Sequence, residues 1–335
     1  MGAAVTRTPP RPRWRARALC ALIATVLVCV LADRAQAEPY ALVVSGATGG
    51  ATAGEQIDQW RSALVQLLQG SLRYPADHVI VLAEDAGAGA LPATKAQVQT
   101  TFTALRARLT ARDQLLVVWL GHGSGGEGED ARFNLVGPDM TAREWAAQLA
   151  PLQASLVLVN TTGGSAPFLP ALSGRRRVVL TATDAAAQQY DTIFPQFFIE
   201  ALRGAADTDK NGKVSVWEAF TFASAGVRGW YEQRGRLVTE TAMLDDTGDG
   251  VGRGAEEPGD DGVLAQLTYV QTDAPITEPD PAKRAALVRR AALMTEFEAL
   301  RLKKPSMDAE TYESALERVL LEIAQIDRAM RAVAH

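Results

Sequence analysis

The chain has 335 residues, of which 47% are hydrophobic, and a formal net charge of −5. This composition supports a folded core and excludes a disordered chain. Residues 1–37 hold six of the 34 Lys and Arg and one of the 39 Asp and Glu, which leaves 28 basic and 38 acidic side chains in residues 38–335. A net charge of about −10 argues against nucleic acid as a partner and fits divalent cations better.

The N-terminal segment has the order of a secretory signal peptide. Residues 7–17 carry five arginines and no acid, residues 18–32 are an apolar run, and Ala35-Gln36-Ala37 is a small-x-small cleavage site. We expect cleavage after Ala37 and export to the periplasm or the extracellular space. The alternative is a retained membrane anchor, but the run is shorter than the ~20 residues that a spanning helix needs.

Cleavage would remove every cysteine from the protein. Cys20 and Cys29, the two cysteines of the chain, both lie in the apolar run of the signal. The mature protein is therefore expected to have no disulfide, no thiolate metal site and no cysteine nucleophile.

The first two-thirds of the mature chain alternates apolar runs with helical patterns. Continuous apolar runs of this kind are typical of strands buried on both faces, and helices between them imply parallel crossovers. Residues 38–235 therefore predict an α/β domain with a doubly wound, mostly parallel sheet and its site beyond the carboxyl ends of the strands. The expected strands lie at residues 40–46, 78–82, 115–120, 155–159 and 178–182.

One histidine follows the third of these strands, between two glycines. His122 in Gly121-His122-Gly123 is placed to act as a general base, and the N–H of Gly123 could donate to an oxyanion. The alternative is a structural histidine whose ring only forms a hydrogen bond within a loop.

Five segments in order resemble the legumain/caspase group of cysteine peptidases. The resemblance covers roughly residues 40–235 and implies a three-layer sandwich in which His122 matches the catalytic histidine and Gly123 an oxyanion-hole residue. The segments are Leu42-Val43-Val44-Ser45-Gly46, Gly121-His122-Gly123-Ser124, Phe133-Asn134-Leu135-Val136-Gly137-Pro138-Asp139, Leu156-Val157-Leu158-Val159-Asn160 and Val178-Val179-Leu180-Thr181-Ala182-Thr183.

The sequence departs from that family where the nucleophile should stand. By register, Thr162 takes the place of the cysteine. A threonine hydroxyl does not ionise as a thiol does and needs a strong base held close. We therefore expect a pseudo-peptidase whose pocket around Ser45, His122 and Thr162 binds a peptide or protein without hydrolysing it. The alternative is a hydrolase that uses Thr162 or Ser165 with His122 as the base.

Residues 207–218 fit the EF-hand calcium loop position by position. Gly212 supplies the sharp turn at position 6, and residues 195–203 and 216–231 are the expected flanking helices. The alternative is an acidic surface loop. The expected Ca²⁺ ligands are Asp207, Asp209, Asn211, Lys213 through its carbonyl, Ser215 and Glu218.

A second acidic segment fits the same pattern less well. Asp245, Asp249 and Glu256 fall at loop positions 1, 5 and 12, but Gly252 stands at position 8 and no helical pattern follows. The segment is either a second calcium loop or a solvated acidic turn. We assign residues 236–281 to an acidic loop and a linker.

Residues 282–335 predict a separate helical hairpin. Two amphipathic stretches are interrupted at Lys304-Pro305-Ser306, as expected for two antiparallel helices with coiled-coil-like packing. The hairpin either folds back on its own domain or self-associates with another chain.

Overall fold

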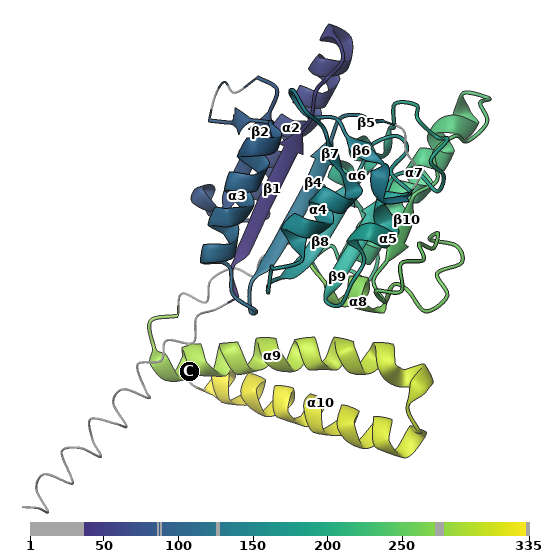
Figure 1. Ribbon diagram of the computed structural model, residues 1–335. Helices are drawn as coiled ribbons and strands as arrows, with labels where there is room; N and C mark the ends of the chain where they lie inside the picture. Colours follow the sequence, from purple (N-terminus) through teal and green to yellow (C-terminus); the bar gives the residue numbers. More distant parts are fainter. Residues whose placement is uncertain (1–36, 86, 88, 125–127, 272–277, 333–335) are drawn as a thin grey trace, which may run out of the picture. The chain divides into compact units, whose positions relative to one another are not determined.

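The computed structural model describes residues 37–335 except 86, 88, 125–127, 272–277 and 333–335 (Figure 1). Glu38–His335 forms one compact unit. The predicted signal peptide, up to residue 36, lies outside the described residues. Within the described part of the chain, no helix is both long enough and apolar enough to cross a membrane.

The centre of the fold is a seven-stranded sheet with the order β10-β9-β8-β4-β1-β2-β3. All neighbouring strands pair in parallel except β9 and β10, which are antiparallel. This arrangement confirms the predicted doubly wound, mostly parallel α/β fold. The strands are β1 (Pro39–Ser45), β2 (Val79–Ala83), β3 (Leu91–Pro92), β4 (Gln114–Leu120), β8 (Ser155–Asn160), β9 (Arg177–Thr181) and β10 (Met243–Asp245).

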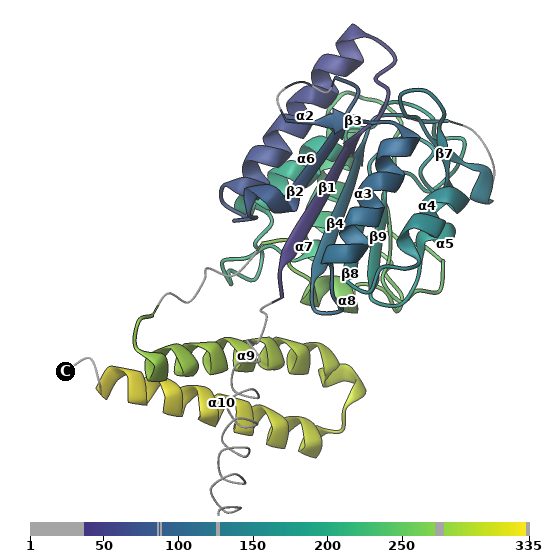
Figure 2. The same ribbon diagram turned by 60° about the vertical axis from the view of Figure 1, so that its left-hand side comes forward.

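Helices cover both faces of this sheet (Figures 1 and 2). One face carries α2 (Ala51–Gln69), α6 (Phe194–Glu200) and α7 (Val216–Gln233), and the other carries α3 (Lys95–Arg108), α4 (Ala142–Leu149) and α5 (Phe168–Leu172). Short 3₁₀ turns lie at Ala76–His78 and Gly128–Asp130.

The central strand shows why the apolar runs are continuous. In β4, Leu116, Val118 and Leu120 pack in the core under α2, α6 and α7, whereas Leu115, Val117 and Trp119 pack on the opposite side. Both sets are buried, so neither could be polar without leaving an unsatisfied group in the core. Burial of each large side chain of this kind stabilises the fold by roughly 1.5–3 kcal/mol.

A small antiparallel sheet follows β4 directly. It consists of β5 (Gly123–Ser124), β6 (Arg132–Phe133) and β7 (Met140–Thr141) in that order. Thr141 then caps α4 in a full capping box with Glu144. His122 lies at the junction between β4 and β5, where the chain leaves the main sheet.

The α/β domain extends beyond residue 235, where the sequence placed its end. In the segment assigned to an acidic loop and linker, β10 adds an antiparallel edge strand to the sheet and α8 (Val263–Leu267) follows. Farther on, the Tyr74 hydroxyl donates to the carbonyl of Val270 at 2.9 Å, and the N–H of Val216 donates to the carbonyl of Thr268 at 2.8 Å. The segment up to Val270 is therefore part of the domain.

The C-terminal residues form the predicted hairpin. Helices α9 (Pro281–Lys303) and α10 (Ala309–Ala332) are joined by a 3₁₀ turn at Lys304–Ser306. Their antiparallel register is marked by ion pairs between Arg289 and Glu322 at 2.6 Å and between Arg290 and Asp327 at 2.7 Å. A further pair joins Arg318 to Glu296.

Candidate functional site

Main-chain atoms pack closely against glycines where the parallel strands end. A Cβ atom on Gly46 would lie 2.1 Å from the carbonyl oxygen of Asn134. A Cβ on Gly123 would lie 2.5 Å from the carbonyl oxygen of Gly163, and one on Gly163 would lie 2.4 Å from that of Tyr190. These three positions therefore exclude any side chain, and they hold the loops after β1, β4 and β8 against their neighbours.

Both ring nitrogens of His122 have partners. Nε2 lies 2.9 Å from the carbonyl oxygen of Thr48, and Nδ1 lies 3.2 Å from a carboxylate oxygen of Asp191. A carbonyl oxygen can only accept, so Nε2 carries the hydrogen in its contact with Thr48. Nε2 is therefore engaged as a donor, and a carboxylate rather than a hydroxyl lies beside Nδ1.

Asp191 is the site residue that sequence reasoning missed. Its side chain is 80% exposed and lies in the connection between β9 and α6, 69 positions after His122. The surrounding polar segment contains no motif, and the pairing exists only because the fold brings the end of β4 beside this connection. An acid in a polar loop was the only sequence signal.

Thr162 is buried completely and its hydroxyl is already engaged. The Oγ1 atom donates to Oδ1 of Asn160 at 2.8 Å, and the backbone N–H of Thr162 donates to the same oxygen at 3.1 Å. Ser165 is equally buried, and its hydroxyl pairs with that of Thr183 at 3.0 Å. Neither predicted nucleophile is hydrogen-bonded to His122 or open to solvent.

Residues 188–190 lie directly over the loop that contains Thr162. The N–H of Gly164 donates to the carbonyl of Gln188 at 2.6 Å, and Gly163 packs against the carbonyl of Tyr190. The hydroxyl of Thr192 donates to the carbonyl of Thr161. This covering segment explains why a residue beyond the end of a strand is inaccessible.

A cavity of about 60 Å³ adjoins His122 on the side of α2 and α6. Its walls include Ile57, Trp60 and Pro195, with Asp191 among its lining residues. Neither Ser45 nor Thr162 lines it, since both are buried beneath the ends of the strands. Of the predicted pocket residues Ser45, His122 and Thr162, only His122 lines this cavity.

The loop 207–218 is shaped by its own side chains. Both carboxylate oxygens of Asp207 accept backbone hydrogens, from Asn211 and from Gly212, each at 3.0 Å. Gly212 adopts a φ of 82°, the left-handed conformation that glycine accepts without strain. The loop connects a π-helical turn at Ala201–Ala205, which continues α6, to the start of α7.

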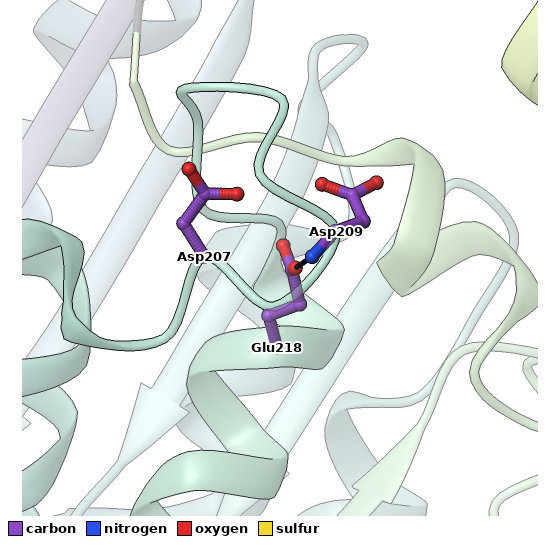
Figure 3. A group of neighbouring side chains, drawn as sticks. All are labelled: Asp207, Asp209 and Glu218. Atoms are coloured by element: carbon purple, nitrogen blue, oxygen red, sulfur yellow. Dashed lines mark hydrogen bonds between the residues drawn. The ribbon is translucent and has the colours of Figure 1, made fainter.

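Three carboxylates converge in this loop (Figure 3). Asp207, Asp209 and Glu218 each place an oxygen within 4.8 Å of the others. In the described part of the chain this is the only group of three or more His, Cys, Asp or Glu side chains with such spacing. Carboxylate oxygens are ligands that Ca²⁺ accepts.

Glu218 is held in place from two sides. It forms a capping box with Ser215 at the start of α7, and its other oxygen accepts from the N–H of Thr208 at 3.0 Å. Burial tends to raise the pKa of Glu218, but these hydrogen bonds from Ser215 and Thr208 outweigh it, so the pKa lies below its usual value. The carboxylate therefore stays charged and oriented.

The other predicted ligands lie in the same loop. The side-chain oxygen of Asn211 accepts from the N–H of Lys213 at 2.8 Å, and the hydroxyl of Ser215 donates to Glu218 at 2.9 Å. The structure thus brings Asp207, Asp209 and Glu218 together and engages the Asn211 and Ser215 oxygens in bonds within the loop.

The second acidic segment does not gather its predicted ligands. Asp245 accepts backbone hydrogens from Gly248 and Gly250, whereas Glu256 forms an ion pair with Arg228 of α7. Asp249 lies 3.5 Å from Arg253. The structure does not gather Asp245, Asp249 and Glu256, because these carboxylates have separate partners, and this arrangement favours the alternative of an acidic turn.

An arginine supplies the positive charge in this segment. The guanidinium of Arg253 lies between Asp249 and Asp261, whose buried carboxylate oxygen is 3.7 Å away. Gly259 makes room for it, since a Cβ there would lie 2.5 Å from Nε of Arg253. Backbone N–H groups and this arginine stabilise the acidic turn.

No family model matches the chain, and a search of the curated proteins finds no relative. Among solved structures, the chain is similar to a crystal structure of a protein from Geobacter sulfurreducens, with 12% sequence identity and a TM-score of 0.39. The match covers 62% of this chain and 92% of the other.

Proposed function

We propose that the mature chain is an exported, calcium-binding protein whose legumain/caspase-like domain recognises a peptide or protein without cutting it. Two features support the resemblance at the level of the site. The strand β4, which ends two residues before His122, pairs in the sheet with β8, which ends two residues before Thr162. Gly123 lies next to His122 in the chain, and a Cβ atom on it would lie 3.1 Å from the Thr162 hydroxyl.

The observation that carries the pseudo-peptidase proposal is the set of hydrogen bonds at this edge. Attack by a hydroxyl requires a base within about 2.6–3.2 Å of it. Here the Thr162 hydroxyl donates to Asn160, and both nitrogens of His122 face Thr48 and Asp191. His122 is then a structural clamp that ties the loop after β1 to the connection before α6.

The hydrolase alternative retains one favourable observation, the carboxylate of Asp191 beside Nδ1 of His122. A carboxylate in that position orients the imidazole in known triads. We expect no peptide hydrolysis when the purified protein is incubated with a mixed peptide library, with or without calcium. Turnover that is abolished by His122→Ala would support the hydrolase. The control is His78→Ala, because His78 stacks on Tyr40 at 4.0 Å and its Nδ1 lies 3.1 Å from the carbonyl oxygen of Pro39, so turnover should be retained.

Calcium binding is the part of the proposal with the most direct test. We expect about one Ca²⁺ per chain, with a Kd on the order of 10⁻⁴–10⁻³ M, the range of extracellular modules. Glu218→Gln should weaken binding by at least about 10-fold, because it removes the bidentate ligand at position 12. Titration calorimetry measures both values, and Tb³⁺ luminescence sensitised by the neighbouring Trp217 reports occupancy of the loop.

The chain offers a matched control for this substitution. Glu256→Gln changes a carboxylate that pairs with Arg228 in the second acidic segment, so we expect it to leave the Ca²⁺ affinity unchanged. Equal weakening by both substitutions would mean that the protein binds calcium only through its general negative charge. Binding of two Ca²⁺ ions per chain would support a second calcium site in the segment of Asp245, Asp249 and Glu256.

A further inference from the structure

A cavity of about 440 Å³ lies at the amino ends of β8 and β9, at the edge of the sheet opposite to His122. Its walls come from the ends of α4 and α5, which lie side by side on one face of the sheet (Figures 1 and 2), and from the residues that lead into the two strands. The volume falls within the ~300–1,000 Å³ that is typical of small-molecule sites. Among the described residues that line it are three consecutive arginines, Arg175, Arg176 and Arg177, and no Asp or Glu.

Arg177 is a positive charge without a carboxylate partner among the described residues. Its guanidinium donates to the carbonyl oxygen of Leu172 at 2.9 Å and to that of Leu149 at 3.2 Å, where α5 and α4 end. These bonds fix the side chain and use two of its five N–H groups. Carbonyl oxygens carry only partial negative charge, so burial lowers the pKa of Arg177 with nothing to offset it. A bound anion would supply the missing opposite charge.

The two preceding arginines differ in how firmly they are held. Arg176 has a φ of 61°, which is uncommon for a residue with a side chain. Its guanidinium donates to the carbonyl of Gln153 at 3.1 Å and to the hydroxyl of Ser155 at 3.0 Å, and it also donates to the carbonyl of Ala111. Arg175 is exposed, and its side chain has no hydrogen bond or ion pair with any residue that the structure describes. All five N–H groups of Arg175 can therefore serve a ligand.

Another part of the cavity wall is apolar. Ala146, Leu152 and Ala171 are partly exposed there and pack on the buried core beneath α4 and α5. An inorganic anion would leave this surface in water, whereas a ligand with a hydrocarbon body would cover it. A carboxylate can also accept two parallel N–H bonds from one guanidinium. The wall and the arginines together favour an anion that is apolar at one end.

We propose that this cavity binds a small amphipathic carboxylate, an anion with one carboxylate group and a short hydrocarbon body. The carboxylate accepts hydrogens from Arg175 and from the unused N–H groups of Arg177, and the hydrocarbon body covers the apolar wall. In a chain with more acidic than basic residues, three arginines without carboxylate partners make this edge of the sheet a local exception that attracts anions. The site is separate from His122 and from the calcium loop and does not depend on the function proposed for them.

Titration calorimetry of the mature protein, residues 38–335, with sodium octanoate tests the proposal. We expect one octanoate per chain with a Kd on the order of 10⁻⁴ M, a reasonable value for so small a ligand. Arg175→Gln should weaken binding at least about 10-fold, because it removes a charge-assisted contact to the carboxylate. Arg73→Gln is the matched control: it removes the same charge from another exposed arginine, outside the cavity, and should leave the affinity unchanged.

Two related compounds separate the contributions of charge and hydrocarbon. Octanol has the same body without the carboxylate, and inorganic phosphate has charge without the body, so each should bind at least about 10-fold more weakly than octanoate. Equal affinity of either compound, or equal weakening by Arg175→Gln and Arg73→Gln, would overturn the assignment. So would the absence of saturable octanoate binding up to about 5 mM, both by calorimetry and by saturation-transfer NMR, which does not depend on the heat of binding.

Discussion

Replacing Thr162 with cysteine is expected to give a thiol that reacts with an alkylating reagent about a thousand-fold more slowly than an exposed one, because reaction must await local opening. Thr162 is fully buried, and residues 188–190 lie over its loop. The thiolate is the reactive form and needs solvent. Since Cys20 and Cys29 lie before residue 38, the new thiol is the only one in residues 38–335.

Tyr190→Cys is the matched control, because that side chain is 70% exposed and belongs to the covering segment itself. Mass spectrometry of the two variants over time gives both rates under native conditions. If the thiol at position 162 reacts within about ten-fold of the control, opening costs less than about 1.4 kcal/mol. The site would then be accessible, and the pseudo-peptidase proposal would lose its main support.

Glu240→Gln is expected to remove a pH dependence of stability worth on the order of 3 kcal/mol. Glu240 is 3% exposed, and burial raises its pKa to about 7, although N–H groups of Ile193 and Phe194 donate to it. A carboxyl whose pKa is raised on folding favours the folded state below its unfolded pKa. That contribution is lost as the pH rises from about 4.5 to about 7.

Urea unfolding of both proteins at several pH values between 4.5 and 8 measures this effect. The amide of glutamine does not titrate, so the difference in unfolding free energy between wild type and variant should shift across that range in favour of the variant. Loss of one hydrogen bond to Ile193 or Phe194 adds an offset that is the same at every pH. Glu232→Gln, an exposed change on α7, is the matched control. Parallel pH profiles for wild type and Glu240→Gln would contradict the prediction.

The main sheet was predictable because its strands carry a strong local signal. Each of β1, β4, β8 and β9 is an apolar run buried on both faces, which no solvent-facing element would need, and β2 is an apolar run that is partly buried. The edge strand β10 gave no such signal, since Met243–Asp245 has only three residues and ends in an acid. Its pairing with β9 depends on the chain returning to the sheet, which composition does not reveal.

The residues of the site could be predicted from the sequence, but their hydrogen-bond partners could not. The motif around His122 and the order of the strands placed His122, Gly123 and Thr162 at one edge, and the structure has them there. The hydrogen bonds of the site depend on segments that carry no motif, above all residues 188–192. The same limit explains the second acidic segment, where Arg253 lies among carboxylates whose spacing alone suggests a cation site.

The contacts of Gly46, Gly123 and Gly163 have a consequence for how such a domain can change over evolutionary time. The carbonyl oxygens of Asn134, Gly163 and Tyr190 pack against these three positions. Main-chain contacts, rather than the side chains nearby, therefore fix the shape of the strand ends. A substitution of the Thr162 side chain removes none of these three main-chain contacts. A scaffold of this kind can keep the shape of its strand ends while the side chains around them change.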